Sequence, residues 1–318
     1  MSEDPAALGR RLREGDRSAG PEALNALEDR SPAGRERAAA LLAEVSPAAL
    51  GGEAPGHLIG LTGPPGAGKS SLLSALVPAW RGQGRSVAVL AVDPSSKRSG
   101  GSLLGDRARI EHDPRDDAVL IRSTAAGGRM GGLAAPTREA ADALAAAYDV
   151  VMIETVGVGQ SETDVEDVSD TVAVVVQPAS GDTLQFLKAG IMEVPDVLVV
   201  TKADLGEVAE RAQKDLAAAL GALGSAEIPV VAVSSVAPTA GIEELIETLD
   251  KHRAELGVPA HRRRGRRRRA VAELIAEDGE QALRALGGRR EAERLLEGED
   301  AGLDVPAMLA RLREAAAS

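Results

Sequence analysis

The segment GPPGAGKS, Gly63 to Ser70, matches the phosphate-binding pattern G-x-x-x-x-G-K-[ST]. Its glycines allow successive backbone N–H groups to face phosphate oxygens, while Lys69 offers charge to the β- and γ-phosphates and Ser70 offers a hydroxyl to Mg²⁺. An apolar run precedes the loop and the helix-like SLLSALVPAW follows it, which favours phosphate binding over a mere Gly/Pro-rich turn. We assign to the nucleotide Gly63, Pro64, Pro65, Gly66, Ala67, Gly68, Lys69, Ser70 and Ser71.

A second segment, VVTKAD, predicts which base is bound. The Asp204 carboxylate can accept hydrogen bonds from the ring N–H and the exocyclic amine of guanine, and Lys202 can lay its aliphatic stem along the base. Adenine lacks that pair of donors, so a site that leaves the carboxylate unpaired rejects it. A charged strand end is the alternative interpretation. We assign to the base and its surroundings Thr201, Lys202, Asp204, Ser234 and Ser235.

Three acidic residues at or near predicted strand ends are candidates for a metal site. Glu154 follows the apolar run VVMI, Asp93 ends the run SVAVLAVD, and Asp106 lies in GGSLLGD. Mg²⁺ is usually held by few carboxylates together with water and phosphate. We therefore expect Asp93, Asp106 and Glu154, with Ser70, to surround one ion without all contacting it directly.

The segment ETVGVGQ predicts where hydrolysis takes place. The Gly157 N–H is expected to contact the γ-phosphate. In small signalling GTPases a glutamine that positions water directly follows the equivalent glycine, whereas here Val158 does and Gln160 comes two residues later. The displaced Gln160 predicts slow basal turnover that a partner or a loop movement completes; a surface role for Gln160 is the alternative.

Seven apolar, β-branched runs recur along the chain and are separated by helical patterns such as TREAADALAAAY. Near-continuous apolar runs indicate parallel strands covered on both faces. The order predicts an α/β P-loop fold with a mostly parallel sheet flanked by helices and ligands at the carboxyl ends of its strands. The runs begin at His57, Ser86, Ala118, Asp149, Thr171, Asp196 and Ile228.

Composition shifts divide the chain into three parts. Residues 1–50 are rich in Ala, Leu, Arg and Glu and predict short helices broken at Pro21, Pro32 and Pro47. Residues 51–256 carry the nucleotide motifs, and residues 257–318 are again helical in pattern. We expect an N-terminal helical extension, a nucleotide-binding domain and a C-terminal helical arm.

Composition also limits the expected cellular compartment and the expected classes of binding partner. The 318 residues carry a net charge of −12, which argues against nucleic acid as main partner, and cysteine is absent. No signal peptide and no apolar stretch long enough to cross a bilayer are recognised, which predicts a cytoplasmic protein. The run HRRRGRRRR, residues 261–269, has seven arginines; a solvated helix or linker, or contact with an acidic surface, is favoured over nucleic-acid binding because aromatic residues for stacking are almost lacking.

The motifs together resemble the methylmalonyl-CoA mutase-associated GTPases of the MeaB/ArgK type, formerly described as transport kinases. The resemblance rests on GPPGAGKSS, VDPSS…GGSLLGD, ETVGVGQSE, GDTLQFLKAGIMEVPDVLVVTKAD and the N-terminal REGD, and covers roughly residues 1 to 260 in family order. It implies a homodimer with a helical C-terminal dimerisation arm. It also implies a chaperone that gates cofactor delivery to a cobalamin-dependent acyl-CoA mutase and protects the mutase from inactivation.

Within that family, the region around Asp182 and Lys188 behaves as a switch toward the partner, so Lys188 joins Lys69, Gly157 and Gln160 as a catalytic candidate. Two departures stand out: Thr201 replaces the asparagine of N-K-x-D, which predicts some loss of affinity for the base, and the arm lacks expected aromatic residues. The alternatives are a transport-associated nucleotide-dependent kinase, which Asp204 argues against, and a nickel-delivery GTPase, which the absence of cysteine argues against.

Overall fold

The computed structural model describes residues 3–93, 110, 112–127, 132–155, 161–178 and 195–317. The chain forms two compact units. The helical unit contains Met1–Gly56, Asp142–Ala147 and Gly257–Ser318, and the nucleotide unit contains His57–Ala141 and Tyr148–Leu256.

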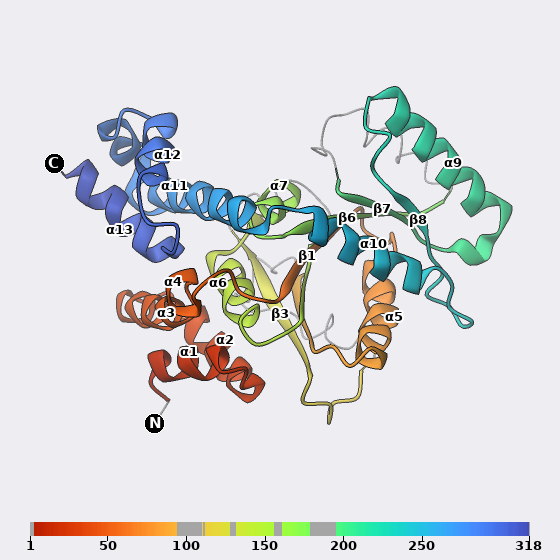
Figure 1. Ribbon diagram of the computed structural model, residues 1–318, viewed down its shortest axis with the longest axis horizontal. Coiled ribbons are helices and arrows are strands. Elements are labelled where there is room, and N and C mark those ends of the chain that lie inside the picture. Colours follow the sequence, from red (N-terminus) through yellow and green to blue (C-terminus); the bar gives the residue numbers. More distant parts are fainter. Residues whose placement is uncertain are drawn as a thin grey trace, which may run out of the picture. The chain divides into compact units, whose positions relative to one another are not determined.

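A twisted sheet forms the centre of the nucleotide unit (Figure 1). Within the described residues it has eight strands in the order β4-β3-β2-β5-β1-β6-β7-β8, and neighbouring strands are parallel except for β4, which pairs antiparallel to β3. The strands are β1 (His57–Thr62), β2 (Val87–Asp93), β3 (Val119–Gly127), β4 (Gly132–Leu133), β5 (Val150–Glu154), β6 (Thr171–Val176), β7 (Val197–Val200) and β8 (Val230–Ala232).

The predicted α/β fold is confirmed, because each of the seven apolar runs forms one of the parallel strands. Strand β4 was not predicted, since two residues give no periodicity to recognise. The order of strands places β1, which leads into the P-loop, between β5 and β6. The residues that follow β1, β5 and β7 therefore reach the same edge of the sheet.

Helices cover both faces of this sheet. Alternate strand residues such as Ile59 and Val89 pack with α5 and α10, and the intervening residues of β6 and β7, such as Leu198, pack with α9. The only tryptophan of the sequence, Trp80, lies in α5 with 1% of its surface exposed. The helices of this unit are α5 (Lys69–Gly82), α7 (Ser161–Glu166), η3 (Ala203–Leu205), α9 (Glu207–Ala222) and α10 (Ile242–Glu255), together with most of α6 (Ala135–Leu144).

The helical unit joins both ends of the chain. Its N-terminal helices are α1 (Pro5–Arg13), η1 (Arg17–Ala19), α2 (Gly20–Glu28), α3 (Pro32–Glu44) and α4 (Pro47–Leu50). Prolines that were predicted as breaks occupy the first turns of α2, α3 and α4, where their missing N–H costs no hydrogen bond. The C-terminal helices α11 (Val258–Ala285), α12 (Arg289–Glu297) and α13 (Val305–Ala316) share an apolar core.

The arginine run lies in α11, and its prediction as a solvated helix or linker is wrong for three of its members. Arg262, Arg266 and Arg269 are 7%, 6% and 5% exposed. Arg266 forms two hydrogen bonds with Glu53, at 2.7 and 2.8 Å, and Arg269 pairs with Asp142 at 2.8 Å. The acidic surface that these arginines contact belongs to the same unit of the chain.

Arg262 serves the same unit by bonding to backbone rather than to acids. Its guanidinium donates to the carbonyl oxygens of Ala54 and Gly56, at 2.7 and 2.6 Å. Planar guanidinium groups with five donors suit such multiple contacts.

Among the helices that the structure describes, none is long and apolar enough to cross a membrane.

Candidate functional site

The P-loop connects β1 to α5 and needs its glycines. Gly63, Gly66 and Gly68 have φ angles of +138°, +78° and +97°, a region that favours glycine. At Gly63 a Cβ atom would stand 2.1 Å from the backbone oxygen of Val175 in β6, so no other residue fits. The loop is thus pressed against β6, and the first turn of α5 begins at Lys69.

Lys69 folds back over its own loop. The residue is 7% exposed, and its Nζ donates to the carbonyl oxygens of Gly63 and Pro64, at 2.7 and 3.2 Å. This places a positive charge at the mouth of the loop and at the N-terminus of α5, where backbone N–H groups also favour anions. The arrangement suits the β- and γ-phosphates of a nucleotide.

Ser70 and Glu154 meet at the carboxyl edge of the sheet. Ser70 Oγ donates to Glu154 Oε1 at 2.8 Å, and Glu154 is 8% exposed. The two are brought together because β5 pairs with β1 and ends beside the loop. A hydroxyl and a buried carboxylate supply oxygen ligands of the kind that Mg²⁺ prefers, so this pair fits that ion.

The segment after β7 is tied to the P-loop by a direct hydrogen bond. Thr201 Oγ1 donates to the Ala67 carbonyl oxygen at 2.7 Å, and Thr201 is 3% exposed. Lys202 adopts a left-handed conformation, with φ of 58°, and its Nζ donates to Gln177 Oε1 at 2.6 Å. The bond from Thr201 fixes the predicted base-binding segment beside the phosphate-binding loop.

Asp204 is exposed and is oriented by the loop that follows β8. Ser234 Oγ donates to Asp204 Oδ1 at 3.1 Å, and the backbone N–H of Ala203 donates to the Val233 carbonyl oxygen at 2.9 Å. Ser235 is half-buried next in the chain. The structure therefore brings together three separate motifs of the sequence: the P-loop, TKAD and the serine pair.

Other predicted residues fall differently. Within the P-loop, Ala67 is buried, Pro65 and Gly66 are exposed, and Ser71 is exposed on α5. Asp93 ends β2, but its side chain lies outside the described part of the chain. The described residues also exclude Asp106, Gly157, Gln160, Asp182 and Lys188.

Two neighbours of the site were not predicted. Gln177 follows β6 and contacts Lys202, and Thr155 Oγ1 donates to Thr62 Oγ1 at 2.9 Å where β1 and β5 end. Both are polar residues directly after strands, Gln177 after β6 and Thr155 after β5, a position at which the carboxyl ends of parallel strands gather their ligands. That signal would have identified them.

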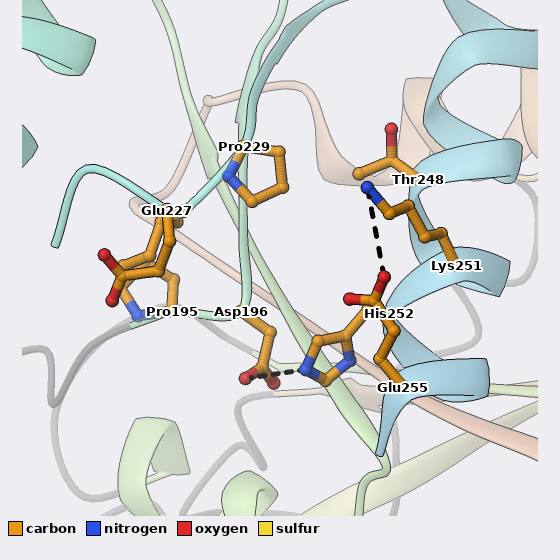
Figure 2. A pocket seen from close by; sticks show the side chains of 9 residues that line it. Pro195, Asp196, Glu227, Pro229, Thr248, Lys251, His252 and Glu255 are labelled. Carbon is orange, nitrogen blue, oxygen red and sulfur yellow. Dashed lines mark ion pairs between the residues drawn. The ribbon is translucent and has the colours of Figure 1, made fainter.

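A separate cavity of about 570 Å³ lies at the opposite edge of the same sheet, between the amino ends of β7 and β8 and the last turns of α10 (Figure 2). His252 and Asp196 form an ion pair in it, at 3.2 Å, and Lys251 pairs with Glu255 at 3.9 Å. The hydrogen bond with Asp196 raises the pKa of His252, although burial opposes it. None of the predicted nucleotide residues lines this cavity.

A chain of buried polar contacts leads inward from His252. Its Nδ1 lies 2.9 Å from Thr171 Oγ1, which in turn lies 2.9 Å from Nε2 of His57. His57 is fully buried, and burial lowers its pKa, although the carboxylates of Asp250 and Asp170 oppose this. Its Nδ1 faces Asp250 at 3.7 Å. The cluster is a structural feature of the amino edge, remote from the phosphate loop.

Comparison of the amino-acid sequence with known proteins identifies a family. Residues 21–287 match the family model described as methylmalonyl Co-A mutase-associated GTPase MeaB. A probable GTPase of Mycobacterium tuberculosis is 41% identical over 256 residues, which cover 78% of this chain and 75% of that protein.

Two further similarities extend this result. A methylmalonic aciduria type A homolog, mitochondrial, from Caenorhabditis elegans is 39% identical over 224 residues, which cover 68% of this chain and 56% of that protein. The crystal structure of a LAO/AO transport system kinase is similar to this chain with a TM-score of 0.65 and 29% identity, over 98% of this chain and 96% of that one.

Proposed function

The chain belongs to the methylmalonyl-CoA mutase-associated GTPase family MeaB, and on that premise we propose that it uses GTP to gate cofactor delivery to a cobalamin-dependent acyl-CoA mutase and to protect that enzyme from inactivation. The family match supports the mutase as partner, and the observation that carries the GTP site is the hydrogen bond from Thr201 to Ala67. It supports a single site in which one segment holds phosphate and the other selects the base.

Within this site the side chains have distinct proposed roles. Lys69 neutralises charge that develops on the transferred phosphoryl group, a contribution worth several kcal/mol in comparable sites. Asp204, oriented by Ser234, accepts from the donor edge of guanine. Ser70 and Glu154 would hold Mg²⁺, which would supply positive charge against the phosphates. Asp93 and Asp106 remain proposed second contributors to the ion.

The protein is proposed to act as a timer: bound GTP is hydrolysed slowly, and a partner detects whether GTP or GDP is bound. A complete nucleotide site with a displaced glutamine, Gln160, suits slow hydrolysis whose state another protein detects. The proposed carriers of that signal are the loop that contains Gly157 and the segment around Lys188. The homodimer, the C-terminal dimerisation arm and the cytoplasmic location are also part of this proposal.

The test is GTP turnover of the full chain with and without a purified cobalamin-dependent mutase. We expect the mutase to accelerate turnover, and Lys188→Ala to reduce the acceleration more than the basal rate. As a control, Lys69→Ala should lower basal turnover by at least about 100-fold, which shows that this site carries the activity. No acceleration, with equal mutase affinity for the GTP-analogue and GDP forms, would leave an ordinary GTPase.

A nucleotide-dependent kinase linked to transport is the second candidate, because the chain is 29% identical to the LAO/AO transport system kinase, with a TM-score of 0.65. The same turnover assay separates the two. A kinase passes the γ-phosphoryl group to an acceptor, in this assay the chain itself or the added mutase, so that released phosphate would fall short of the GTP consumed. Equal amounts of GDP and free phosphate support the hydrolase.

A further inference from the structure

Thr201 stands where the N-K-x-D signature has asparagine, and its hydroxyl is already engaged by the protein. Oγ1 lies 2.7 Å from the Ala67 carbonyl oxygen and 3.1 Å from that of Val176. A hydroxyl carries one proton, which here is taken by a carbonyl of the P-loop or of β6. Since Thr201 is only 3% exposed, this side chain has no second donor to offer a ligand.

The packing around Thr201 also fixes the direction of its hydroxyl. The backbone N–H of Thr201 donates to the Val176 carbonyl oxygen at 2.9 Å. On the other side, a Cβ atom built on Gly68 would lie 3.6 Å from both Cγ2 and Oγ1 of Thr201. The side chain therefore lies directly against the last turn of the P-loop, and its hydroxyl is held between a P-loop carbonyl and the carbonyl that ends β6.

The chemistry of guanine makes this arrangement consequential. One edge of the base presents two acceptors, N7 and O6, whereas N1–H and the N2 amine are donors. An asparagine amide has two N–H donors and one oxygen, so it can bond to the protein and still donate to N7. A threonine that has given its single proton to Ala67 cannot do both. Asp204 accepts hydrogen bonds and therefore serves the donor edge alone.

We propose, on the basis of the proposed guanine site, that Thr201 is a positioning residue. N7 of the base then receives no hydrogen bond from the side chain at position 201. The Thr201 hydroxyl holds Ala67 of the P-loop against the segment Thr201–Asp204. Base selection then depends on N1–H and the N2 amine. The ligands of the site consequently include 7-deazaguanine nucleotides, in which a C–H replaces N7.

The experiment is a set of calorimetric titrations of the full chain with GDP, 7-deaza-GDP, IDP and ADP. We expect GDP and 7-deaza-GDP to bind within about threefold of one another, because the protein has no donor at this position that loses its partner when C–H replaces the acceptor N7. IDP lacks the N2 amine and should bind at least about tenfold more weakly. A 7-deaza-GDP affinity about tenfold or more below that of GDP overturns the inference.

Variants at position 201 separate positioning from base reading. Thr201→Val should weaken GDP and 7-deaza-GDP by the same factor, about tenfold, while Thr201→Ser restores both. Thr201→Asn should bind GDP about fivefold better than 7-deaza-GDP, because the amide adds a donor. A Thr201→Val protein with an altered ratio of the two affinities, or a Thr201→Asn protein that binds both alike, overturns the inference. Circular dichroism of each variant checks that the fold is kept.

The same titrations keep this inference distinct from the proposed function. Equal affinities for GDP, 7-deaza-GDP and ADP would remove the guanine assignment, and the inference with it. A preference for GDP over ADP combined with weak binding of 7-deaza-GDP would remove the inference alone and leave the guanine site intact.

Discussion

Asp204 is a single side chain on which the choice of base is proposed to depend. It is exposed, and its position is set by the hydroxyl of Ser234. Asp204→Asn replaces an acceptor with a group that also donates, so xanthine, which carries a carbonyl where guanine has its amine, becomes the better partner. We expect the ratio of xanthosine to guanosine diphosphate affinity to rise by about 100-fold or more.

Calorimetric titration with both diphosphates measures this ratio. Glu207→Gln, at another exposed acid three residues further on, is the matched control and should leave it unchanged. An Asp204→Asn protein that still prefers guanine by the original factor would show that another group reads the N2 amine.

His252 gives stability a defined dependence on pH. Its pKa is raised in the folded state by the hydrogen bond with Asp196. A raised pKa means that this contribution is fully present below the unfolded value, about 6.5, and is lost as pH rises through the folded pKa. His252→Gln should therefore lower the free energy of unfolding of the nucleotide unit by about 1–2 kcal/mol at pH 6, and by less at pH 9.

The comparison must be between wild type and variant at each pH. His57 is buried with a lowered pKa, so its protonation in the unfolded state weakens folding as pH falls below about 6.5, whichever residue occupies position 252. Urea unfolding at pH 6 and pH 9 supplies the four free energies. A difference between the two proteins that grows with pH would contradict the assigned ion pair.

At the scale of elements, α11 is defined by arginines that are unequal in role. Arg266 is 6% exposed and forms a two-point ion pair with Glu53, whereas Arg264 in the same run is exposed. Arg266→Met leaves the half-buried carboxylate of Glu53, whose side chain is 12% exposed, without its partner and should destabilise the helical unit by about 3 kcal/mol. The matched Arg264→Met change should cost less than about 0.5 kcal/mol.

Chemical unfolding followed by far-ultraviolet circular dichroism measures both variants. The double change Arg266→Met with Glu53→Leu should recover part of the loss, because a buried apolar pair avoids the desolvation penalty. Equal effects of the two methionine variants would mean that the buried pair is no more important to stability than a surface charge.

The elements differ in how far the sequence revealed them. The seven parallel strands were predictable because each is a continuous apolar run, and the P-loop because its spacing is specific. The burial of Arg266 and Arg269 was not, because seven arginines close together usually indicate an exposed segment. Their partners Glu53 and Asp142 lie 213 and 127 residues away, beyond any local pattern.

The candidate site shows the same division. Lys69, Ser70 and Asp204 were recognised from motifs, whereas the bond from Thr201 to Ala67 spans 134 residues and depends on the order of the strands. The prediction that Thr201 costs some affinity for the base stays a prediction. So do the roles of Gly157, Gln160 and Lys188.

For the molecule as a whole, binding of the mutase and binding of the nucleotide must be thermodynamically linked if the protein acts as the proposed timer. If the mutase prefers one nucleotide state, then the mutase must change the relative affinities for GDP and a GTP analogue by the same factor, typically about 5- to 150-fold. Mutase affinity for each nucleotide form, and nucleotide affinity with and without mutase, close a thermodynamic cycle. Independence of all four affinities would contradict coupling, whatever the rate of hydrolysis.

The buried Trp80 makes the two units optically distinct. It is the one indole of the chain and lies in α5, the helix that starts at Lys69, and the one tyrosine, Tyr148, also belongs to the nucleotide unit, whereas the residues of the helical unit include no Trp, Tyr or Phe. The helical unit therefore has no tryptophan or tyrosine fluorescence, and its unfolding is followed by far-ultraviolet circular dichroism of its backbone. Tryptophan fluorescence therefore reports the unfolding of the nucleotide unit without any added label. Unfolding of the helical unit does not contribute to that signal.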